Sequence, residues 1–268
     1  MDLTEILETL SKGKISVSKA QKLLSLYSIE KIEEFAKIDT GRKIRNGVPE
    51  VIFAEKKQLS EIKKIISRVL TKTDSVLVSR IQKKHFEKII QYCKKNKLKI
   101  KKGKNTRTLL IHQKVIKKTG GRVGIITAGT SDISVAEEAR LMCEAMNCEC
   151  ITSYDIGIAG LHRTFPILKE FIKSEVNVII VAAGMEGALA SVVSSTVNVP
   201  VIGVPTSVGY GYGEKGVAAL ASMLQSCALG LSVVNIDNGI GAGAVASKIA
   251  NIMSKNNVKK KPSHYSRK

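Results

Sequence analysis

The stretch Val123-Gly-Ile-Ile-Thr-Ala-Gly-Thr-Ser-Asp-Ile-Ser-Val-Ala-Glu-Glu-Ala139 decides the fold, because an unbroken apolar run gives way to helical spacing. The apolar run predicts a strand, and the small residues after it predict a tight turn. Ser131 or Asp132 is expected to cap the helix that follows. Free backbone N–H groups at such a turn can bind an anion, and Gly129 has no side chain to block it. The alternative is an ordinary capped turn without a ligand.

Strands and helices continue to alternate after this stretch, which predicts an α/β domain with a doubly wound, flavodoxin-like parallel sheet. Ligands of such sheets bind at the carboxyl ends of the strands. The expected strands are 123–127, 150–154, 178–182, 201–204 and 231–234, and the expected helices are 132–146, 164–174, one starting near 185, 214–229 and 241–253.

The preceding residues predict a smaller α/β domain. Its expected helices are 3–10, 16–26, 30–37, 58–70 and 83–95, with strands at 51–53, 76–79 and 108–111. We therefore predict a basic N-terminal domain at 1–118, the flavodoxin-like domain at 119–254 and a disordered Lys-rich tail at 255–268.

The net charge of +20 is unevenly distributed. Residues 1–120 hold 30 Lys and Arg against 12 Asp and Glu, whereas residues 121–254 hold 7 against 11. Lysine dominates the basic half, and aromatic residues make up 4% of the chain, so we expect no specific nucleic-acid partner. A solvated lysine-rich surface accounts for the charge.

No stretch of the sequence is long and apolar enough to span a membrane, and the acidic start is not that of a secretory signal. We therefore expect a cytoplasmic protein without a membrane partner. The five cysteines are expected to be thiols rather than disulfides. Cys143, Cys148 and Cys150 are unevenly spaced and have no fourth ligand nearby, so buried structural thiols are favoured over a zinc site.

Several blocks of residues in the second domain resemble those of a known family. Gly129-Thr-Ser-Asp132, His162-Arg163-Thr164 and Gly184-Met-Glu-Gly-Ala-Leu189 resemble blocks of the purE-type aminoimidazole ribonucleotide carboxylases. With Arg42 and Arg45 in front and Cys227 behind, the whole chain resembles the carboxylase/hydrolase family of nickel-pincer nucleotide biosynthesis, which serves lactate racemase.

The resemblance implies that the enzyme carboxylates the pyridinium ring of nicotinic acid adenine dinucleotide with carbon dioxide or bicarbonate. It then hydrolyses the phosphoanhydride, giving pyridinium biscarboxylic acid mononucleotide and AMP. The resemblance also implies a homo-octamer. Magnesium or a similar divalent cation is expected for the hydrolysis, with Asp132 as its candidate ligand, and no tightly bound organic cofactor is expected.

The catalytic candidates are Cys227, Glu186 and His162. Cys227 matches the family's ring nucleophile, although spacing alone favours a small core residue on an apolar helix. Glu186 could orient the pyridinium or take the ring proton. His162 corresponds to the proton-transfer histidine of the purine enzymes, or it is a packing histidine.

The candidates for binding substrate or phosphate are Gly129, Thr130, Ser131, Asp132, Arg163, Gly184, Arg42 and Arg45. The paired arginines could make bidentate contacts with phosphate, or they could simply be exposed.

Two other functions are compatible with parts of the sequence. A purine-pathway carboxylase or mutase would share the second domain but would need neither the basic extension nor the pair Cys227 and Glu186. A non-enzymatic nucleotide-binding protein would account for the charge and the glycine-rich loops, but it would not need a reactive thiol.

Overall fold

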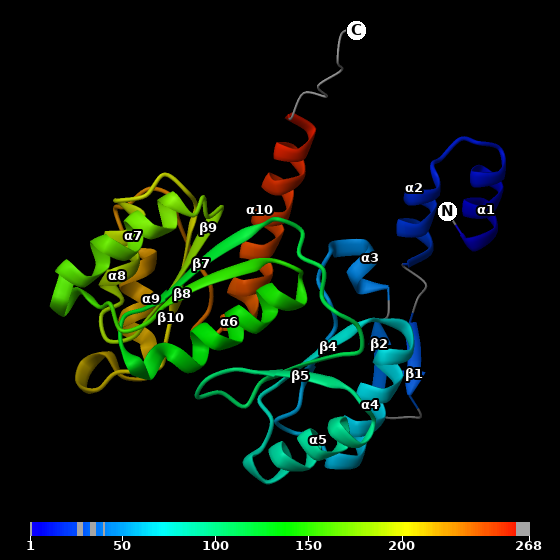
Figure 1. Ribbon diagram of the computed structural model, residues 1–268, viewed down its shortest axis with the longest axis horizontal. Coiled ribbons are helices and arrows are strands. Elements are labelled where there is room, and N and C mark those ends of the chain that lie inside the picture. Colours follow the sequence, from blue (N-terminus) through cyan, green and yellow to red (C-terminus); the bar gives the residue numbers. More distant parts are fainter. Residues whose placement is uncertain (1, 26–28, 33–35, 40, 261–268) are drawn as a thin grey trace, which may run out of the picture. The chain divides into compact units, whose positions relative to one another are not determined.

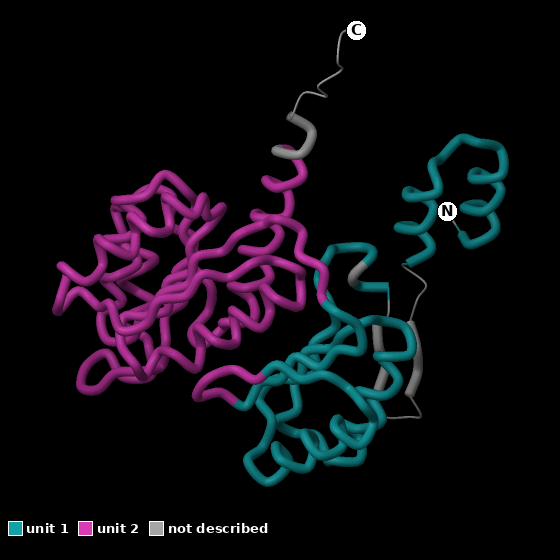
Figure 2. The backbone as a smooth tube through the Cα atoms, in the orientation of Figure 1, with its two compact units in different colours: residues 1–101, 107–115 teal, residues 102–106, 116–268 magenta. Residues whose placement is uncertain are grey.

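The computed structural model describes residues 2–25, 29–32, 36–39 and 41–260, and the chain divides into two compact units (Figure 1 and Figure 2). Unit 1 comprises residues 1–101 and 107–115, and unit 2 comprises residues 102–106 and 116–268. The loop 102–106 belongs to unit 2, and the predicted domain boundary after residue 118 stays a prediction.

A five-stranded parallel sheet forms the centre of unit 2, with strand order β11-β10-β9-β7-β8 (Figure 1). Every residue of β9 and β10 is buried, as expected for strands that are covered on both faces. The strands are β7 (Arg122–Thr127), β8 (Glu149–Ser153), β9 (Val178–Ala183), β10 (Val201–Pro205) and β11 (Leu231–Val233).

Helices cover both faces of this sheet, which confirms the predicted doubly wound fold. Because successive strand residues point to opposite faces, Ile125 packs in one hydrophobic cluster and Ile126 in the other. The first cluster is covered by α6 (Ile133–Ala145) and α10 (Gly239–Lys260), and the second by α7 (Thr164–Lys173), α8 (Ala188–Ser194) and α9 (Val217–Leu224).

A four-stranded mixed sheet, in the order β3-β4-β6-β5, forms the centre of unit 1. β3 (Val51–Phe53) pairs parallel with β4 (Ser75–Ser79), which pairs antiparallel with β6 (Leu109–His112). The remaining elements of unit 1 are α1 (Leu3–Ser11), α2 (Val17–Leu24), β1 (Ile29–Ile32), β2 (Ala36–Asp39), α3 (Arg42–Asn46), α4 (Leu59–Lys72), α5 (Lys83–Lys95) and β5 (Lys99–Lys102).

The observed elements differ from the predicted ones, and α3 and β5 occupy residues for which the sequence predicts no helix or strand. The helix predicted at 30–37 is wrong, because β1 and β2 pair there as antiparallel strands. The helix predicted at 214–229 is shorter, since α9 covers only residues 217–224 and Cys227 lies beyond its end. The last helix continues to Lys260, so residues 255–260 of the predicted disordered tail are helical.

Glycine in α10 allows this helix to approach α6 closely. A Cβ atom built on Gly243 would lie 2.6 Å from the backbone oxygen of Ala139, and one built on Gly239 would lie 2.2 Å from that of Val135. Real Cβ atoms do not come this close to a backbone oxygen. The spacing of the two helices therefore depends on the missing side chains.

Replacing Gly243 with Ala should destabilise the protein, although alanine favours a helix over glycine by about 1 kcal/mol. The reason is the steric conflict with Ala139, which the α6 backbone can relieve only by moving away from α10. Urea unfolding of Gly243→Ala shows whether the free energy of unfolding falls or rises. The reciprocal change at the next position, Ala244→Gly, gives the helix-propensity effect by itself, and a Gly243→Ala protein more stable than wild type would contradict the close packing.

Candidate active site

A pocket of about 360 Å³ lies at the carboxyl edge of the unit 2 sheet. Three loops that follow neighbouring strands line it: residues 128–132 after β7, residues 155–159 after β8 and residues 183–189 after β9. Val208, after β10, completes the lining. Parallel strands bring these loops together because all their carboxyl ends meet at one edge. The pocket therefore lies where the sequence predicts a ligand site.

Asp132 is the buried polar centre of this edge, with an exposed fraction of 2%. Its Oδ2 atom accepts a hydrogen bond of 2.8 Å from the backbone N–H of Gly129. Its Oδ1 atom accepts one of 2.6 Å from the hydroxyl of Thr206, which is fully buried. Asp132 therefore ties the loop after β7 to the residue that follows β10. The sequence suggested Ser131 or Asp132 as the cap of α6. Asp132 is the N-cap residue, but its side chain makes no capping hydrogen bond to the helix.

Burial raises the pKa of Asp132, because an apolar environment disfavours the charged carboxylate. Hydrogen bonds from Thr206, Gly129 and Gly184 act in the opposite direction, since they stabilise the ionised form. The nearby carboxylate of Asp237 adds a smaller upward contribution. The loop is therefore held by a carboxylate whose charge depends on its hydrogen-bond donors.

The turn after β9 brings Glu186 to the rim of the pocket, where its side chain is exposed. Met185, with φ of 54°, and Gly187, with φ of 68°, both have left-handed backbone conformations. The Met185 N–H donates a hydrogen bond of 2.8 Å to the carbonyl of Val208. This contact requires a glycine at position 184, because a Cβ atom there would lie 2.3 Å from the same oxygen.

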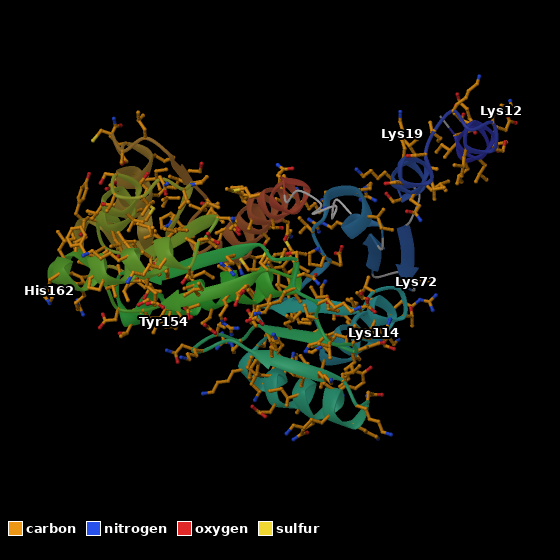
Figure 3. The ribbon with its side chains drawn as sticks, turned by 45° about the horizontal axis from the view of Figure 1, so that its top comes forward. Lys12, Lys19, Lys72, Lys114, Tyr154 and His162 are labelled. Carbon is orange, nitrogen blue, oxygen red and sulfur yellow. The ribbon has the colours of Figure 1, made fainter. Side chains whose placement is uncertain are left out.

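Thr130 and Ser131 also line the pocket, with exposed side chains in the 3-10 turn η2 (Thr130–Asp132). Two further candidates lie outside it. His162 and Arg163 belong to the 3-10 segment η3 (Ile158–Arg163), of which only the first residues line the pocket. Figure 3 shows His162 at the outer edge of unit 2, and its side chain is exposed.

Arg163 forms an ion pair of 3.3 Å with Asp155, which does line the pocket. This pair holds the Arg163 guanidinium next to the rim, where the Asp155 carboxylate balances its charge. Arg42 and Arg45 belong to unit 1, where Arg42 pairs with Glu50 at 3.7 Å and Arg45 donates to the Ser25 carbonyl at 2.6 Å. A role for these two arginines in ligand binding stays a prediction.

Cys227 does not line the pocket. It is exposed, whereas Cys93, Cys143 and Cys148 are buried and Cys150 is intermediate, so Cys227 is not the core residue that its spacing alone favours. Cys227 lies between the end of α9 and the start of β11, at the amino edge of the sheet. Within one chain the structure therefore separates Cys227 from Glu186.

Sequence reasoning missed a buried polar cluster on α6. The Glu137 carboxylate accepts hydrogen bonds from Arg140, from the Tyr154 hydroxyl and, at 2.8 Å, from the backbone N–H of Lys104. Burial would raise the pKa of Glu137, but these donors outweigh it and lower the pKa. Arg140 also pairs with Glu144, and the spacing of these charges along one helix face was the available signal.

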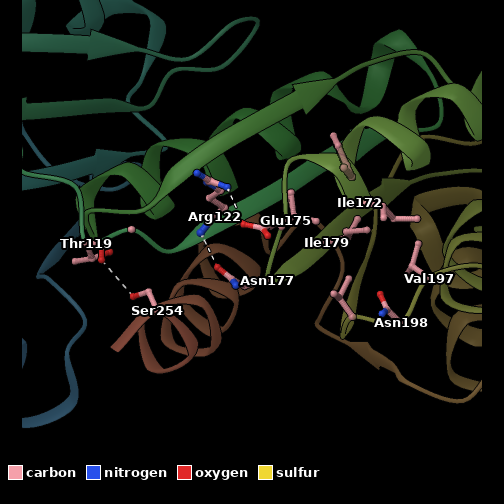
Figure 4. Close-up of a pocket in the computed structure, with 13 residues that line it drawn as sticks. Thr119, Arg122, Ile172, Glu175, Asn177, Ile179, Val197, Asn198 and Ser254 are labelled. Carbon is pink, nitrogen blue, oxygen red and sulfur yellow. Dashed lines mark hydrogen bonds and ion pairs between the residues drawn. The ribbon is translucent and has the colours of Figure 1, made fainter. Parts of the chain in front are cut away.

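A larger hollow, of about 710 Å³, lies at the amino edge of the same sheet (Figure 4). Five of its polar residues are paired with one another. Arg122 forms an ion pair of 3.6 Å with Glu175, its N–H donates to Asn177, and Ser254 donates to the Thr119 carbonyl. None of its lining residues is a cysteine, and it lies away from the strand ends that carry the predicted site residues.

The predicted magnesium site at Asp132 is not preformed. Both carboxylate oxygens already accept hydrogen bonds from the protein, and within the described part of the chain no group of three or more His, Cys, Asp and Glu could hold a metal ion. The magnesium requirement therefore stays a prediction.

Comparisons with known proteins agree with this geometry. Residues 122–268 match the model of the AIR carboxylase family, where AIR stands for aminoimidazole ribonucleotide. The chain belongs to this family. Residues 29–113 match the LarB/PurE-like N-terminal domain, so the protein combines the two domains as the LarB-type members do. The resemblance read from the sequence is thus confirmed at the level of family and domain combination.

Individual relatives support the same assignment. An uncharacterized protein of Methanocaldococcus jannaschii is 47% identical over 259 residues, which cover 95% of this chain and 99% of the relative. The N5-carboxyaminoimidazole ribonucleotide mutase of Thermotoga maritima is 32% identical over 136 residues, covering 49% of this chain and 75% of that protein. The protein therefore has a carboxylase-family role.

No helix in its described residues is long and apolar enough to cross a membrane.

Thr206→Val should destabilise the protein by about 2 kcal/mol near neutral pH, because it removes a buried donor to an ionised carboxylate. Loss of this donor raises the pKa of Asp132 further. The destabilisation is therefore present where Asp132 is ionised, and it should shrink as the pH falls toward the ordinary value of 3.8. Urea unfolding at several pH values measures it. Thr196→Val removes a hydroxyl from the exposed end of α8 and serves as the control. A loss of stability in Thr206→Val that does not depend on pH would contradict the hydrogen bond from Thr206 to an ionised Asp132.

Gly184→Ala should lower stability by about 1–3 kcal/mol, since the added methyl group collides with the Val208 carbonyl and the Thr206 hydroxyl. Gly129→Ala is a matched control in the same pocket, because the nearest atom to its Cβ is Asp132 Oδ2 at 3.6 Å, an ordinary contact. Thermal unfolding of both variants compares the two sites. Equal effects would show that close approach at residue 184 is not required.

Proposed function

We propose that the protein carboxylates the pyridinium ring of nicotinic acid adenine dinucleotide and hydrolyses its phosphoanhydride. The products would be pyridinium biscarboxylic acid mononucleotide and AMP, for nickel-pincer cofactor synthesis and lactate racemase. The observation that carries the proposal is the combination of both domains with a carboxylate, Glu186, on the rim of the carboxyl-edge pocket and an exposed thiol, Cys227.

The pyridinium ring is electron-poor, so its carbon atoms cannot attack carbon dioxide directly. In the proposed reaction the Cys227 thiolate adds to a ring carbon, and the new C–S bond places an electron pair on the ring nitrogen. The resulting enamine carbon then attacks carbon dioxide and forms the C–C bond. Glu186 takes the proton from that carbon, and the C–S bond breaks with its electron pair on sulfur, which restores the aromatic pyridinium.

The hydrolysis needs the phosphoanhydride to be held next to an attacking water molecule. The loop Gly129–Asp132 lines the pocket with the exposed hydroxyl side chains of Thr130 and Ser131, which can donate hydrogen bonds to phosphate oxygens. Arg163 lies near the rim, and in the proposed complex its guanidinium would exchange its contact with Asp155 for one with a phosphate oxygen. His162 remains a candidate for proton transfer, and we propose no step through a metal ion.

A second candidate function is that of the purine-pathway enzymes. It is favoured by the similarity to N5-carboxyaminoimidazole ribonucleotide mutases over about half of this chain. That similarity leaves the N-terminal domain unexplained, and it assigns no role to Cys227. Conversion of aminoimidazole ribonucleotide or its carboxylated form, without reaction of the dinucleotide, would favour this second function over the first.

Mass spectrometry of the products tests the proposal. The purified protein is incubated with nicotinic acid adenine dinucleotide, magnesium and bicarbonate labelled with carbon-13. A mononucleotide that carries the label in a new carboxyl group, together with AMP, is expected. Unchanged dinucleotide, with turnover of aminoimidazole ribonucleotide instead, would overturn the proposal.

Cys227→Ala should lower carboxylation by orders of magnitude while the dinucleotide still binds, because the ring then stays aromatic and electron-poor. Cys227→Ser should be almost as inactive, since a serine hydroxyl forms far less of the ionised nucleophile than a thiol. Initial rates of labelled-product formation and equilibrium binding separate the two effects. Cys150→Ser, a change at a half-buried cysteine, is the control. Carboxylation by Cys227→Ala at the wild-type rate would exclude the thiol from the chemistry.

A further inference from the structure

A loop from the N-terminal family domain packs within the unit that contains the pocket. Residues 102–106 fall inside the match to the LarB/PurE-like N-terminal domain, yet they belong to unit 2 (Figure 2). They contact Glu137, a residue of α6 that lies inside the AIR carboxylase match. The loop therefore brings residues of both family domains together inside one compact unit.

Glu137 is buried, with an exposed fraction of 2%, and each of its carboxylate oxygens has two donors. Arg140 donates to Oε1 through Nε at 2.8 Å and to Oε2 through Nη2 at 2.7 Å. The Tyr154 hydroxyl is the second donor to Oε1, and the backbone N–H of Lys104 is the second donor to Oε2, at 2.8 Å. A buried carboxylate is tolerated only when its oxygens are paired in this way. Removing the loop or the tyrosine hydroxyl leaves one oxygen with a single donor.

The same loop also contacts the two side chains that bind Glu137. The Lys102 carbonyl accepts a hydrogen bond of 3.2 Å from Arg140. The Lys104 ammonium lies 5.6 Å from the centroid of the Tyr154 ring, within the range of a cation–π contact. Each contact restricts one donor of the carboxylate. The loop therefore helps to fix the orientation of Tyr154 as well as that of Glu137.

Tyr154, labelled in Figure 3, directly precedes the segment 155–159 that lines the pocket. The first residue of this segment, Asp155, has a left-handed backbone with φ of 60°. Its N–H donates a hydrogen bond of 3.0 Å to the hydroxyl of Thr127, at the end of β7. Residues other than glycine keep such a conformation only where their surroundings hold it. Thr127 holds Asp155 directly, and the bond from Tyr154 to Glu137 holds the residue before it.

Asp155 in turn holds Arg163 next to the pocket rim, at 3.3 Å. In the proposed function this guanidinium exchanges Asp155 for a phosphate oxygen. A side chain that is already held near its ligand loses less freedom on binding than one that moves freely in solvent, so its position affects affinity. Neither Glu137 nor Tyr154 lines the pocket, so they act on phosphate binding only through the residues that follow them.

We propose that Glu137 and Tyr154 are positioning residues: with the loop 102–106 they fix Asp155, which presents Arg163 to the phosphates of the bound dinucleotide. This inference rests on the proposed function. It assigns a role to part of the N-terminal domain, which the similarity to the mutases leaves unexplained. The affinity for the dinucleotide phosphates then depends on hydrogen bonds that lie outside the pocket.

Steady-state kinetics of Tyr154→Phe separates positioning from a purely structural role. The change removes only the hydroxyl, so the ring and its contact with Lys104 remain. KM for the dinucleotide should rise about tenfold, the loss expected for one hydrogen bond to a charged group, while kcat changes little. Tyr92→Phe makes the same change at a tyrosine of unit 1 that has Lys63 over its ring, and it should leave both constants unchanged. A lower kcat at the wild-type KM, which is the result of a smaller folded fraction, would overturn the proposal.

Binding of inorganic pyrophosphate tests the same chain of contacts without turnover. Isothermal titration calorimetry measures its affinity for wild type, Tyr154→Phe, Arg163→Ala and the double variant. If Tyr154 acts through Arg163, Tyr154→Phe weakens binding about tenfold in the wild-type background and has no further effect after Arg163→Ala. Equal effects in both backgrounds, or pyrophosphate binding that Arg163→Ala leaves unchanged, would overturn the proposal. Failure of the proposed function appears separately, as wild-type protein that binds pyrophosphate but makes no labelled product.

A pair of variants at one position tests the part played by the loop. Lys104→Pro removes the backbone N–H that donates to Glu137, because proline has no such group. KM for the dinucleotide and the pyrophosphate affinity should change in the same direction as in Tyr154→Phe. Lys104→Ala keeps the N–H and removes only the side chain, so it is the matched control and should stay near wild type. Wild-type KM and pyrophosphate affinity in Lys104→Pro would overturn the assignment of the loop.

Discussion

The candidate site depends on the buried hydrogen bonds around Asp132. This carboxylate joins the Gly129 N–H of the loop after β7 to the Thr206 hydroxyl after β10, with Gly184 as a further donor. Gly129 and Thr206 follow β7 and β10, and these strands are not neighbours because β9 lies between them. A single buried group therefore sets the spacing of three loops. Its burial is tolerable only because each oxygen has a donor.

The loops that surround this carboxylate have strained or close-packed backbones. Asp155, Met185 and Asp237 have φ values of 60°, 54° and 54°, in the left-handed region that residues other than glycine rarely adopt. Each follows a strand of the unit 2 sheet. Such conformations persist where the surroundings hold them, and they are concentrated at functional sites. Asn147 and Glu175, which precede β8 and β9 at the amino edge, also have positive φ values, so the pocket rather than the backbone conformation distinguishes the carboxyl edge.

The sequence predicted unit 2 well because its signals agree with one another. Unbroken apolar runs fit strands that are covered on both faces, and the small residues after them fit turns at a parallel-sheet edge. The stretch 29–39 was harder, since its apolar residues suit a helix as well as a strand, and only pairing between β1 and β2 decides the outcome. Local pattern also could not place Cys227, whose position follows from the early end of α9 at Leu224 and from strand order.

Strand direction limits what one copy of this fold can do by itself. In a parallel sheet, every residue that directly precedes a strand lies at the amino edge, and every residue that directly follows one lies at the carboxyl edge. A reaction that needs Glu186 and Cys227 on one ring therefore needs two chains. Cys227 is exposed at the amino edge close to Leu229, which is 93% exposed, so a contact with a second copy that covers this edge would also position the sulfur. Assembly and chemistry would then depend on one surface, so a change that weakens the interface would weaken carboxylation while the pocket of each protomer stays intact.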